Sequence, residues 1–168
     1  VDLVTASALK GVFSPLRTQV NAVNAPGIAE DRGVDVTEAK SSRSEDFHSL
    51  VTVTVSDDEN RLSISGTLFA GDDPRIVRVD GYRVDAVPHG RILIARNRDE
   101  PGVIGFIGSV LGENGVNIAG MYNGRETIGG EALTVYSLDD PVSESVREEI
   151  LDDDRVTDVT YIELNGAD

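Results

Sequence analysis

Residues 91–124, RILIARNRDEPGVIGFIGSVLGENGVNIAGMYNG, hold a strand, a polar turn, a helix and a second strand in unbroken succession. A short alternating apolar run at 91–95 predicts the first strand, and the polar residues at 97–101 interrupt it. Apolar side chains then recur at helical spacing, at Val103, Ile104, Ile107, Val110 and Leu111. Residues 116–122 predict the next strand. This stretch is therefore the clearest indication of fold in the sequence.

The same pattern continues to the end of the chain and predicts a domain at 89–168. Residues 132–138 and 156–164 alternate as strands, and a helix follows Asp139-Asp140-Pro141. The order is βαββαβ, the ferredoxin-like arrangement of a four-stranded antiparallel sheet with two helices on one face. A fold of this kind does not indicate a function by itself.

Residues 1–88 predict a separate domain of helices followed by an antiparallel sheet, so the fold class of the whole chain is α+β. Two helices are expected over 2–24, meeting at Ser14-Pro15, and a short third helix between Asn24 and Gly33. The strands expected after them lie at 34–40, 50–55, 62–69, 76–79 and 82–86. Asp80-Gly81 separates the last two strands and favours a tight hairpin turn.

The chain is strongly acidic, with 30 acidic and 15 basic residues and a net charge of -15. A field of one sign repels polyphosphate, so neither nucleic acid nor an anionic membrane is an expected partner. Lys10 and Lys40 are the only lysines. A composition in which arginine carries nearly all the positive charge is typical of salt-loving microbes and suggests a halophilic archaeon. An ordinary acidic protein is the alternative.

The sequence has no cysteine, which excludes disulfides and thiolate metal sites and is simplest to explain by a reducing cytoplasm. We find no apolar run of membrane-spanning length and no secretory signal. The chain begins at Val1 without a methionine, and we expect it to be a fragment of something longer.

No catalytic constellation is recognisable. His48 and His89 are the only histidines and lie in different predicted domains. Gly102, Gly105 and Gly108 lie along one helix, where close packing against a neighbour explains them better than a dinucleotide does. The acidic run 152–154 lacks the spacing of a calcium loop and reads as a solvated turn. We expect no catalytic residue and no metal site.

The turn at 97–102 offers a different kind of chemistry. It places the Asp99 carboxylate beside the free backbone N–H groups of a helix start, so one site can accept hydrogen bonds from an ammonium and donate them to a carboxylate. These are the two charged groups of a free amino acid, and Asn117 could add a contact from the neighbouring strand or from a partner subunit. Alternatively, Asp99 only caps the helix and Asn117 belongs to the Gly115 turn.

Two sets of motifs resemble known families. RDEPGVIGFIGSVLGENGVNIAGMYNGR, residues 98–125, resembles an ACT domain, specifically the one that closes D-3-phosphoglycerate dehydrogenases. SALKGVFSP, VNAPGIAEDRGV and SGTLFAGDDPRIVRVDGYRVDAVPHG resemble the intervening, or allosteric substrate-binding, domain in the long form of those enzymes. The resemblance covers nearly the whole chain and implies an intervening domain at 1–88 followed by an ACT domain at 89–168.

The resemblance also implies an effector site. Two ACT domains would pair, in a homodimer or tetramer, and bind L-serine or another small amino acid between them for feedback inhibition. Asp99 would meet the ammonium, Asn97 would hold the other polar position of the turn, and Asn117 would reach across from the partner subunit. The carboxylate would be bound by backbone groups of Val103 and Ile104.

In the intervening domain the resemblance implies an anion site, for which Arg75 and Arg83 match two basic positions and Val87 stands at a third. The NAD-dependent catalytic part would precede Val1, so this fragment would hold no cofactor and turn over no substrate. Two alternatives remain open. One is the regulatory region of an iron–sulfur L-serine dehydratase, which also combines a related intervening domain with an ACT domain, and the other is an assembly module without a ligand.

Overall fold

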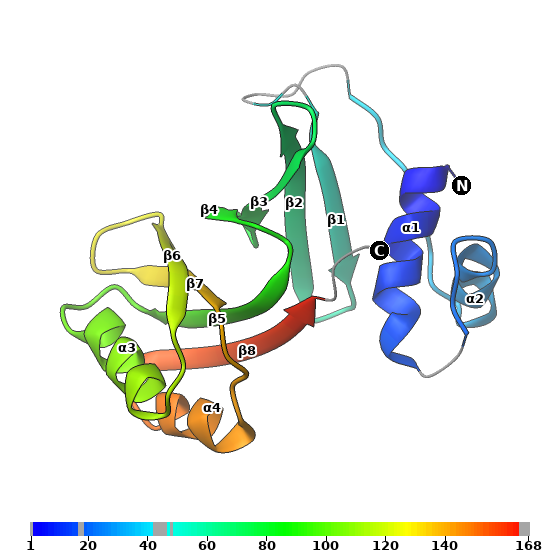
Figure 1. The fold of residues 1–168 in the computed structure, drawn as a ribbon. Helices are drawn as coiled ribbons and strands as arrows, with labels where there is room; N and C mark the ends of the chain where they lie inside the picture. The colour runs from blue at the N-terminus through cyan, green and yellow to red at the C-terminus, as the bar shows by residue number, and fades with distance from the viewer. Residues whose placement is uncertain (1, 17–18, 42–46, 48, 165–168) are drawn as a thin grey trace. The chain divides into compact units, whose positions relative to one another are not determined.

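The computed structural model describes residues 2–16, 19–41, 47 and 49–164, and it divides into two compact units, Val1–Asp46 and Phe47–Asp168 (Figure 1). This division falls inside the predicted 1–88 domain, because the first sheet packs on the second within the larger unit. The domain bounds at 1–88 and 89–168 stay a prediction.

The smaller unit is helical. It contains α1 (Leu3–Phe13), the 3₁₀ turn η1 (Ser14–Leu16) and α2 (Ala25–Asp31). The side chain of Asp2 caps α1 by accepting a hydrogen bond of 3.0 Å from the Thr5 N–H. Leu9, Phe13, Ala25 and Ala29 form the buried cluster of this unit.

The predicted second helix of this unit is wrong over 19–24, where no helix is present, and its residues 17–18 lie outside the described residues. The Asn21 side chain accepts hydrogen bonds from the N–H groups of Val23 and Asn24, and the Asn24 Oδ1 accepts one from the Asn21 N–H. Such local side-chain bonds compete with helix formation.

The strand predicted at 34–40 is also wrong, because this segment pairs with no other strand among the described residues. It is tied instead to the start of α1. Glu38 accepts a hydrogen bond from the Asp2 N–H at 3.0 Å, and the Lys40 ammonium lies 2.9 Å from the Asp2 carboxylate.

The larger unit begins with a four-stranded antiparallel sheet in the order β1-β2-β3-β4. The strands are β1 (Val51–Ser56), β2 (Arg61–Phe69), β3 (Asp73–Val79) and β4 (Tyr82–Ala86). The predicted Asp80-Gly81 turn joins β3 to β4, and both of its residues have positive φ, 46° and 87°. Positive φ at both central residues matches the strand twist of a tight hairpin and is the reason this dipeptide suits the position.

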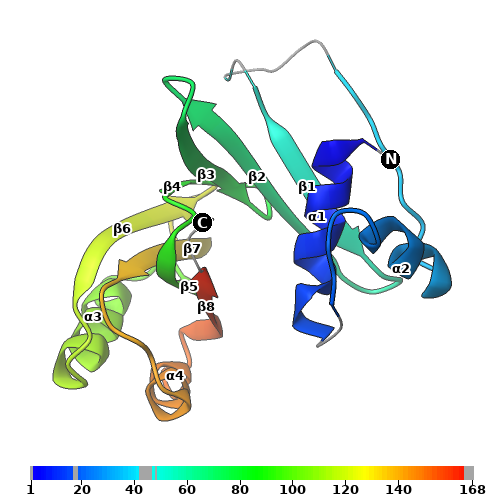
Figure 2. The same ribbon diagram turned by 45° about the vertical axis from the view of Figure 1, so that its right-hand side comes forward.

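The predicted βαββαβ order is confirmed. Its elements are β5 (Gly90–Arg98), α3 (Val103–Glu113), β6 (Ile118–Arg125), β7 (Glu131–Leu138), α4 (Glu144–Leu151) and β8 (Val156–Leu164). The four strands pair antiparallel in the order β6-β7-β5-β8, with α3 and α4 over one face (Figures 1 and 2). Leu93 of β5, Ile107 of α3 and Ile150 of α4 are among the fully buried side chains of that layer.

The opposite face of the second sheet is covered by the first sheet. Val79, Val84 and Ala86 of β3 and β4 form one buried cluster with Ile92, Leu133 and Val135 of β5 and β7. This is a sheet-on-sheet contact within one unit, so β5 and β7 are buried on both faces.

Two contacts fix this packing. β4 lies against β6 so closely that a Cβ at Gly124 would overlap the carbonyl oxygen of Arg83. The carboxylate of Asp80, in the first sheet, pairs with Arg96 of β5 and accepts a hydrogen bond of 2.5 Å from the Ser63 N–H. An ion pair and a backbone approach thus join the two sheets.

We predict that Gly124→Ala lowers the free energy of unfolding by about 1–3 kcal/mol, because the backbone of β4 cannot yield without moving the sheet. Gly112→Ala is the matched control, since a Cβ there meets nothing within 4 Å. In a helix it should raise stability by up to about 1 kcal/mol. Urea denaturation measures both, and equal stability for the two variants would contradict the close approach.

We predict that Asp80→Asn costs about 1–2 kcal/mol, because the amide keeps the oxygen for Ser63 but gives up the charge that pairs with Arg96. Asparagine tolerates the positive φ, so the change isolates the ion pair. Asp72→Asn, at an exposed turn, is the control. Denaturation that shows the same loss in both variants would mean that the inter-sheet pair contributes nothing.

Candidate functional site

The Asp99 carboxylate is held from the end of β6 and the β6–β7 turn. Its Oδ2 accepts hydrogen bonds from the Arg125 guanidinium at 2.6 Å and from the Gly129 N–H at 3.1 Å. The Asp99 N–H donates to the Gly130 carbonyl at 2.7 Å. The Gly129 N–H and the Arg125 charge lower the pKa of Asp99 below its usual value of 3.8, so the group is an anion at neutral pH.

Asp99 does not cap α3, so that alternative for its role is wrong. The N-cap is Gly102, whose φ of 93° is left-handed and whose position offers no side chain. The predicted carboxylate-binding residues follow it. Val103 is buried and Ile104 exposed, and the Val103 N–H makes a long bond of 3.4 Å to the Glu100 carbonyl. First-turn amides lack acceptors within their own helix, which leaves them able to receive an anion.

Asn97 lies on β5 and is only 4% exposed. Its Nδ2 donates to the Arg98 carbonyl at 2.7 Å, and its Oδ1 lies 3.4 Å from the hydroxyl of Thr134, which makes a shorter bond of 2.8 Å to Asn123 Oδ1. Asn97, Thr134 and Asn123 form a polar row across β5, β7 and β6 that we did not predict. Only the strand order reveals it, since residues on three separate strands carry no common spacing.

Tyr136 lies beside that row and is fully buried. Burial raises the pKa of its hydroxyl to about 12, and the hydroxyl has no hydrogen-bond partner of normal geometry in the described chain. The helix-covered face of the sheet thus contains polar groups near the Asp99 turn.

Asn117 lies far from Asp99 within one chain. It precedes Ile118, which pairs with Leu138, whereas Arg125 at the other end of β6 pairs with Ala132. The Asn117 Nδ2 donates to the Asp139 carboxylate at 2.5 Å, and its N–H donates to Asp140 at 3.0 Å. A single chain therefore does not bring Asn117 to the Asp99 turn.

The two predicted anion residues differ in their surroundings. Arg83 lines a pocket of about 160 Å³, and Arg75 does not. Arg75 instead binds Asp73 and Asp85, with 3.0 Å between its Nη1 and Asp85 Oδ1, and the Asp73 carboxylate raises its pKa. Asp85 lines the pocket, so Arg75 contacts a residue of the pocket wall without being one of the lining residues.

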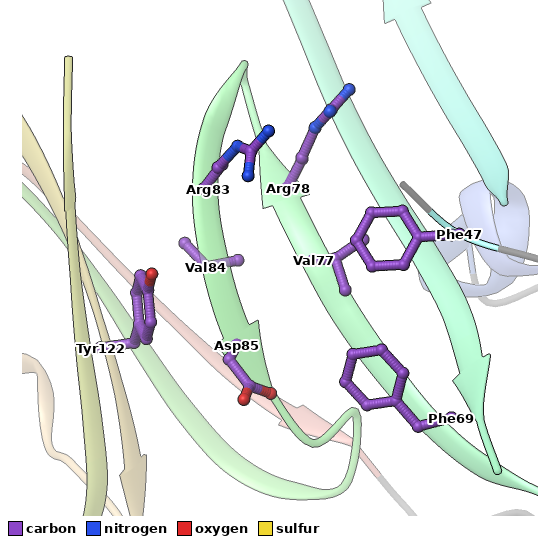
Figure 3. Close-up of a pocket in the computed structure, with 8 residues that line it drawn as sticks. All are labelled: Phe47, Phe69, Val77, Arg78, Arg83, Val84, Asp85 and Tyr122. Carbon is purple, nitrogen blue, oxygen red and sulfur yellow. The ribbon is translucent and has the colours of Figure 1, made fainter. Parts of the chain in front are cut away.

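The second guanidinium at the pocket belongs to Arg78, which we did not predict. Arg78 and Arg83 are paired residues on β3 and β4, and the hairpin register around Asp80-Gly81 was the signal that could have found the pair. Figure 3 shows Tyr122 of β6 at one side of the pocket and Phe47 and Phe69 at the other. The pocket combines aromatic walls with two cations and one carboxylate, which suits a small organic anion.

The remaining candidates do not form a site among the described residues. His89 is exposed and His48 lies outside the described residues. Of the acidic run 152–154, Asp153 is bound by Arg155, with 2.8 Å from Arg155 Nε to its Oδ1. In the described ranges, no three His, Cys, Asp or Glu side chains gather as a metal site would require. Among the same residues no helix is long and apolar enough to cross a membrane.

Arg155 also supports the Asp99 turn. Its carbonyl accepts a hydrogen bond of 2.9 Å from the Arg98 N–H, and its guanidinium donates to the Pro101 carbonyl at 3.3 Å. Asp153 fixes that guanidinium and, through it, has its own pKa lowered to about 2. The contact of Arg155 with the Asp99 turn, which we call the Arg155 brace, therefore depends on an ionised Asp153.

The βαββαβ order with two helices on one face of the sheet defines a ferredoxin-like unit, and residues 91–154 match the family model of the ACT domain. Residues 1–80 match the model of the D-3-phosphoglycerate dehydrogenase intervening domain. The chain thus carries both domains in the predicted order and is homologous to D-3-phosphoglycerate dehydrogenases.

Three relatives illustrate the similarity. The D-3-phosphoglycerate dehydrogenase of Archaeoglobus fulgidus is 39% identical over 166 residues, which cover 97% of this chain and 31% of that protein. That of Methanocaldococcus jannaschii is 38% identical over 164 residues, with the same coverage of 97% and 31%. That of Bacillus subtilis is 32% identical over 164 residues, again 97% and 31%. The chain spans about a third of the length of these curated relatives.

We predict that the chain loses stability in acid as Asp153 is protonated. Folding lowers the pKa of Asp153 from 3.8 to about 2, so the ionised carboxylate stabilises the folded chain above about pH 4. This stabilisation is lost as the pH falls from about 4 to about 2, where Asp153 becomes protonated in the folded chain as well. Asp153→Asn should therefore flatten this part of the curve of unfolding free energy against pH. An unchanged pH dependence in the variant would show that the brace does not contribute.

Proposed function

We propose that this chain is the regulatory part of a D-3-phosphoglycerate dehydrogenase in serine biosynthesis, and that its ACT domain binds L-serine between two copies for feedback inhibition. The observation that carries the proposal is the Asp99 carboxylate, an anion on the turn that leads from β5 into the first turn of α3. A carboxylate there can receive the ammonium of an amino acid, and first-turn amides that lack an acceptor can receive its carboxylate. The two family matches and the dehydrogenase relatives support the parent's identity.

The position of Asn117 supports a site made from two chains. β6 is an edge strand of its sheet, and its Met121 is exposed. A twofold axis through the middle of β6 would pair two copies antiparallel. The start of one strand, with Asn117, would then lie against the end of the other, where Arg125 holds Asp99.

The glycines of α3 fit the same arrangement. A Cβ added at Gly105 or Gly108 would meet nothing within 4 Å among the described residues, so those residues do not supply the close neighbour expected here. A second copy beside β6 would bring its own α3 near this helix. We therefore propose a homodimer, or a tetramer built from such dimers.

In this proposal the chain has no catalytic role of its own. NAD and the reacting substrate belong to the rest of the parent enzyme, in the cytoplasm, and serine acts by favouring one arrangement of two subunits. Arg83 and Arg78 hold a small anion in the neighbouring pocket. The acidic, lysine-poor composition remains the reason to propose a halophilic archaeal source.

We predict that calorimetry detects L-serine binding to the wild-type chain, and that Asp99→Ala and Asn117→Ala each weaken it at least about tenfold, since each removes a hydrogen bond to a charged group. Asp158→Ala, on the exposed edge of β8, is the control. Unaltered affinity in both site variants would remove the proposed site.

Mixing the two site variants tests whether the site spans two chains. A mixed dimer contains one intact site, made from Asp99 of one copy and Asn117 of the other, and one site that lacks both. We predict that an equimolar mixture recovers wild-type affinity at about one site in four, because half of the dimers are mixed at random assortment. No recovery would mean that both residues act within one copy.

A further inference from the structure

Asp99 is already occupied by a cation of its own chain. Arg125 Nη1 lies 2.6 Å from Asp99 Oδ2, the same oxygen that receives the Gly129 N–H. The Asp99 side chain is 16% exposed, whereas that of Arg125 is 47% exposed. One oxygen of a largely buried carboxylate is therefore bound by a side chain that is itself half in solvent.

We propose that Arg125 is an affinity- and specificity-determining residue of the amino-acid site, because its guanidinium must leave Asp99 before a ligand ammonium can bind there. This inference rests on the proposed function for the identity of the ligand. The new element is that Arg125 occupies the ammonium-binding oxygen of Asp99 when no ligand is bound.

Replacing the Arg125 guanidinium by a ligand ammonium on Asp99 costs little free energy. The Asp99 Oδ2 has two lone pairs, and the Arg125 guanidinium and the Gly129 N–H already use both of them, so an ammonium binds this oxygen only when Arg125 leaves it. Because the Arg125 side chain is 47% exposed, solvent screens its pair with Asp99, which contributes on the order of 1 kcal/mol, so a ligand that makes further contacts can displace Arg125. The Gly129 N–H is part of the backbone and stays in place, so the carboxylate keeps one donor during the exchange.

The competition also selects among ligands. A ligand with only an ammonium exchanges one cation for another and gains little. A ligand that adds a carboxylate near the first turn of α3 gains bonds that Arg125 does not make there. Arg125 therefore favours zwitterionic amino acids over simple amines.

The test compares the full chain with Arg125→Ala, Arg125→Lys and the control Arg147→Ala, whose guanidinium pairs with Glu144 on α4. By calorimetry, L-serine should bind Arg125→Ala about two- to fivefold more tightly than wild type, the factor that corresponds to losing a half-exposed competing pair. Arg125→Lys should lie between them, and Arg147→Ala should match wild type. Weaker or unchanged binding to Arg125→Ala overturns the inference.

A second measurement separates this inference from the proposed function. Methylammonium is titrated while the Asp99 carboxyl carbon is followed by NMR, without any amino acid. It should bind Arg125→Ala more tightly than wild type, and the Asp99 pKa of the free variant should rise toward its usual value. Equal methylammonium binding and an unchanged Asp99 pKa overturn the role of Arg125. Tighter methylammonium binding in a chain that ignores L-serine refutes the proposed effector and leaves the role of Arg125 standing.

Discussion

Burial of the second sheet on both faces is the constraint on which the larger unit depends. One face is closed by α3 and α4, and the other by the first sheet. A sheet covered twice requires apolar side chains at successive positions, and Ile92-Leu93 in β5 supplies one to each face. The pair of Asp80 with Arg96 then adds a charged contact at the border of the apolar cluster.

The same double burial explains why the compact units do not follow the domain order. The family matches change from one domain to the next between residues 80 and 91, whereas the structure divides after residue 46. Apolar contact holds the first sheet to the βαββαβ unit. The helical segment before it has only a small core of its own.

Local patterns predicted most of the fold. The helical spacing around Ile107 and the positive-φ turn at Asp80-Gly81 each depend on neighbours in sequence, and both were read correctly. The errors came where side chains override the pattern. Asn21 and Asn24 bond to nearby amides in place of a helix, and residues 34–40 alternate like a strand without a partner to pair with.

The candidate site was predictable only in part, because its charges are assembled across the sheet. Asp99 and Asn117 stand out in the sequence by their places next to a helix start and a strand start. The partner of Asp99 does not. Arg125 lies 26 residues further along the chain. It meets Asp99 because β7 lies between β5 and β6 in the sheet, which brings the end of β6 and the β6–β7 turn close to the end of β5. No spacing rule connects the two residues.

The strand β6 connects the pocket of Arg83 to the Asp99 turn. Tyr122 lines the pocket of Arg83, Gly124 touches the backbone of Arg83, and Arg125 holds Asp99, all within four consecutive residues. An anion that altered serine affinity through this strand would have its own affinity altered by serine by the same factor, in whichever order the two arrived.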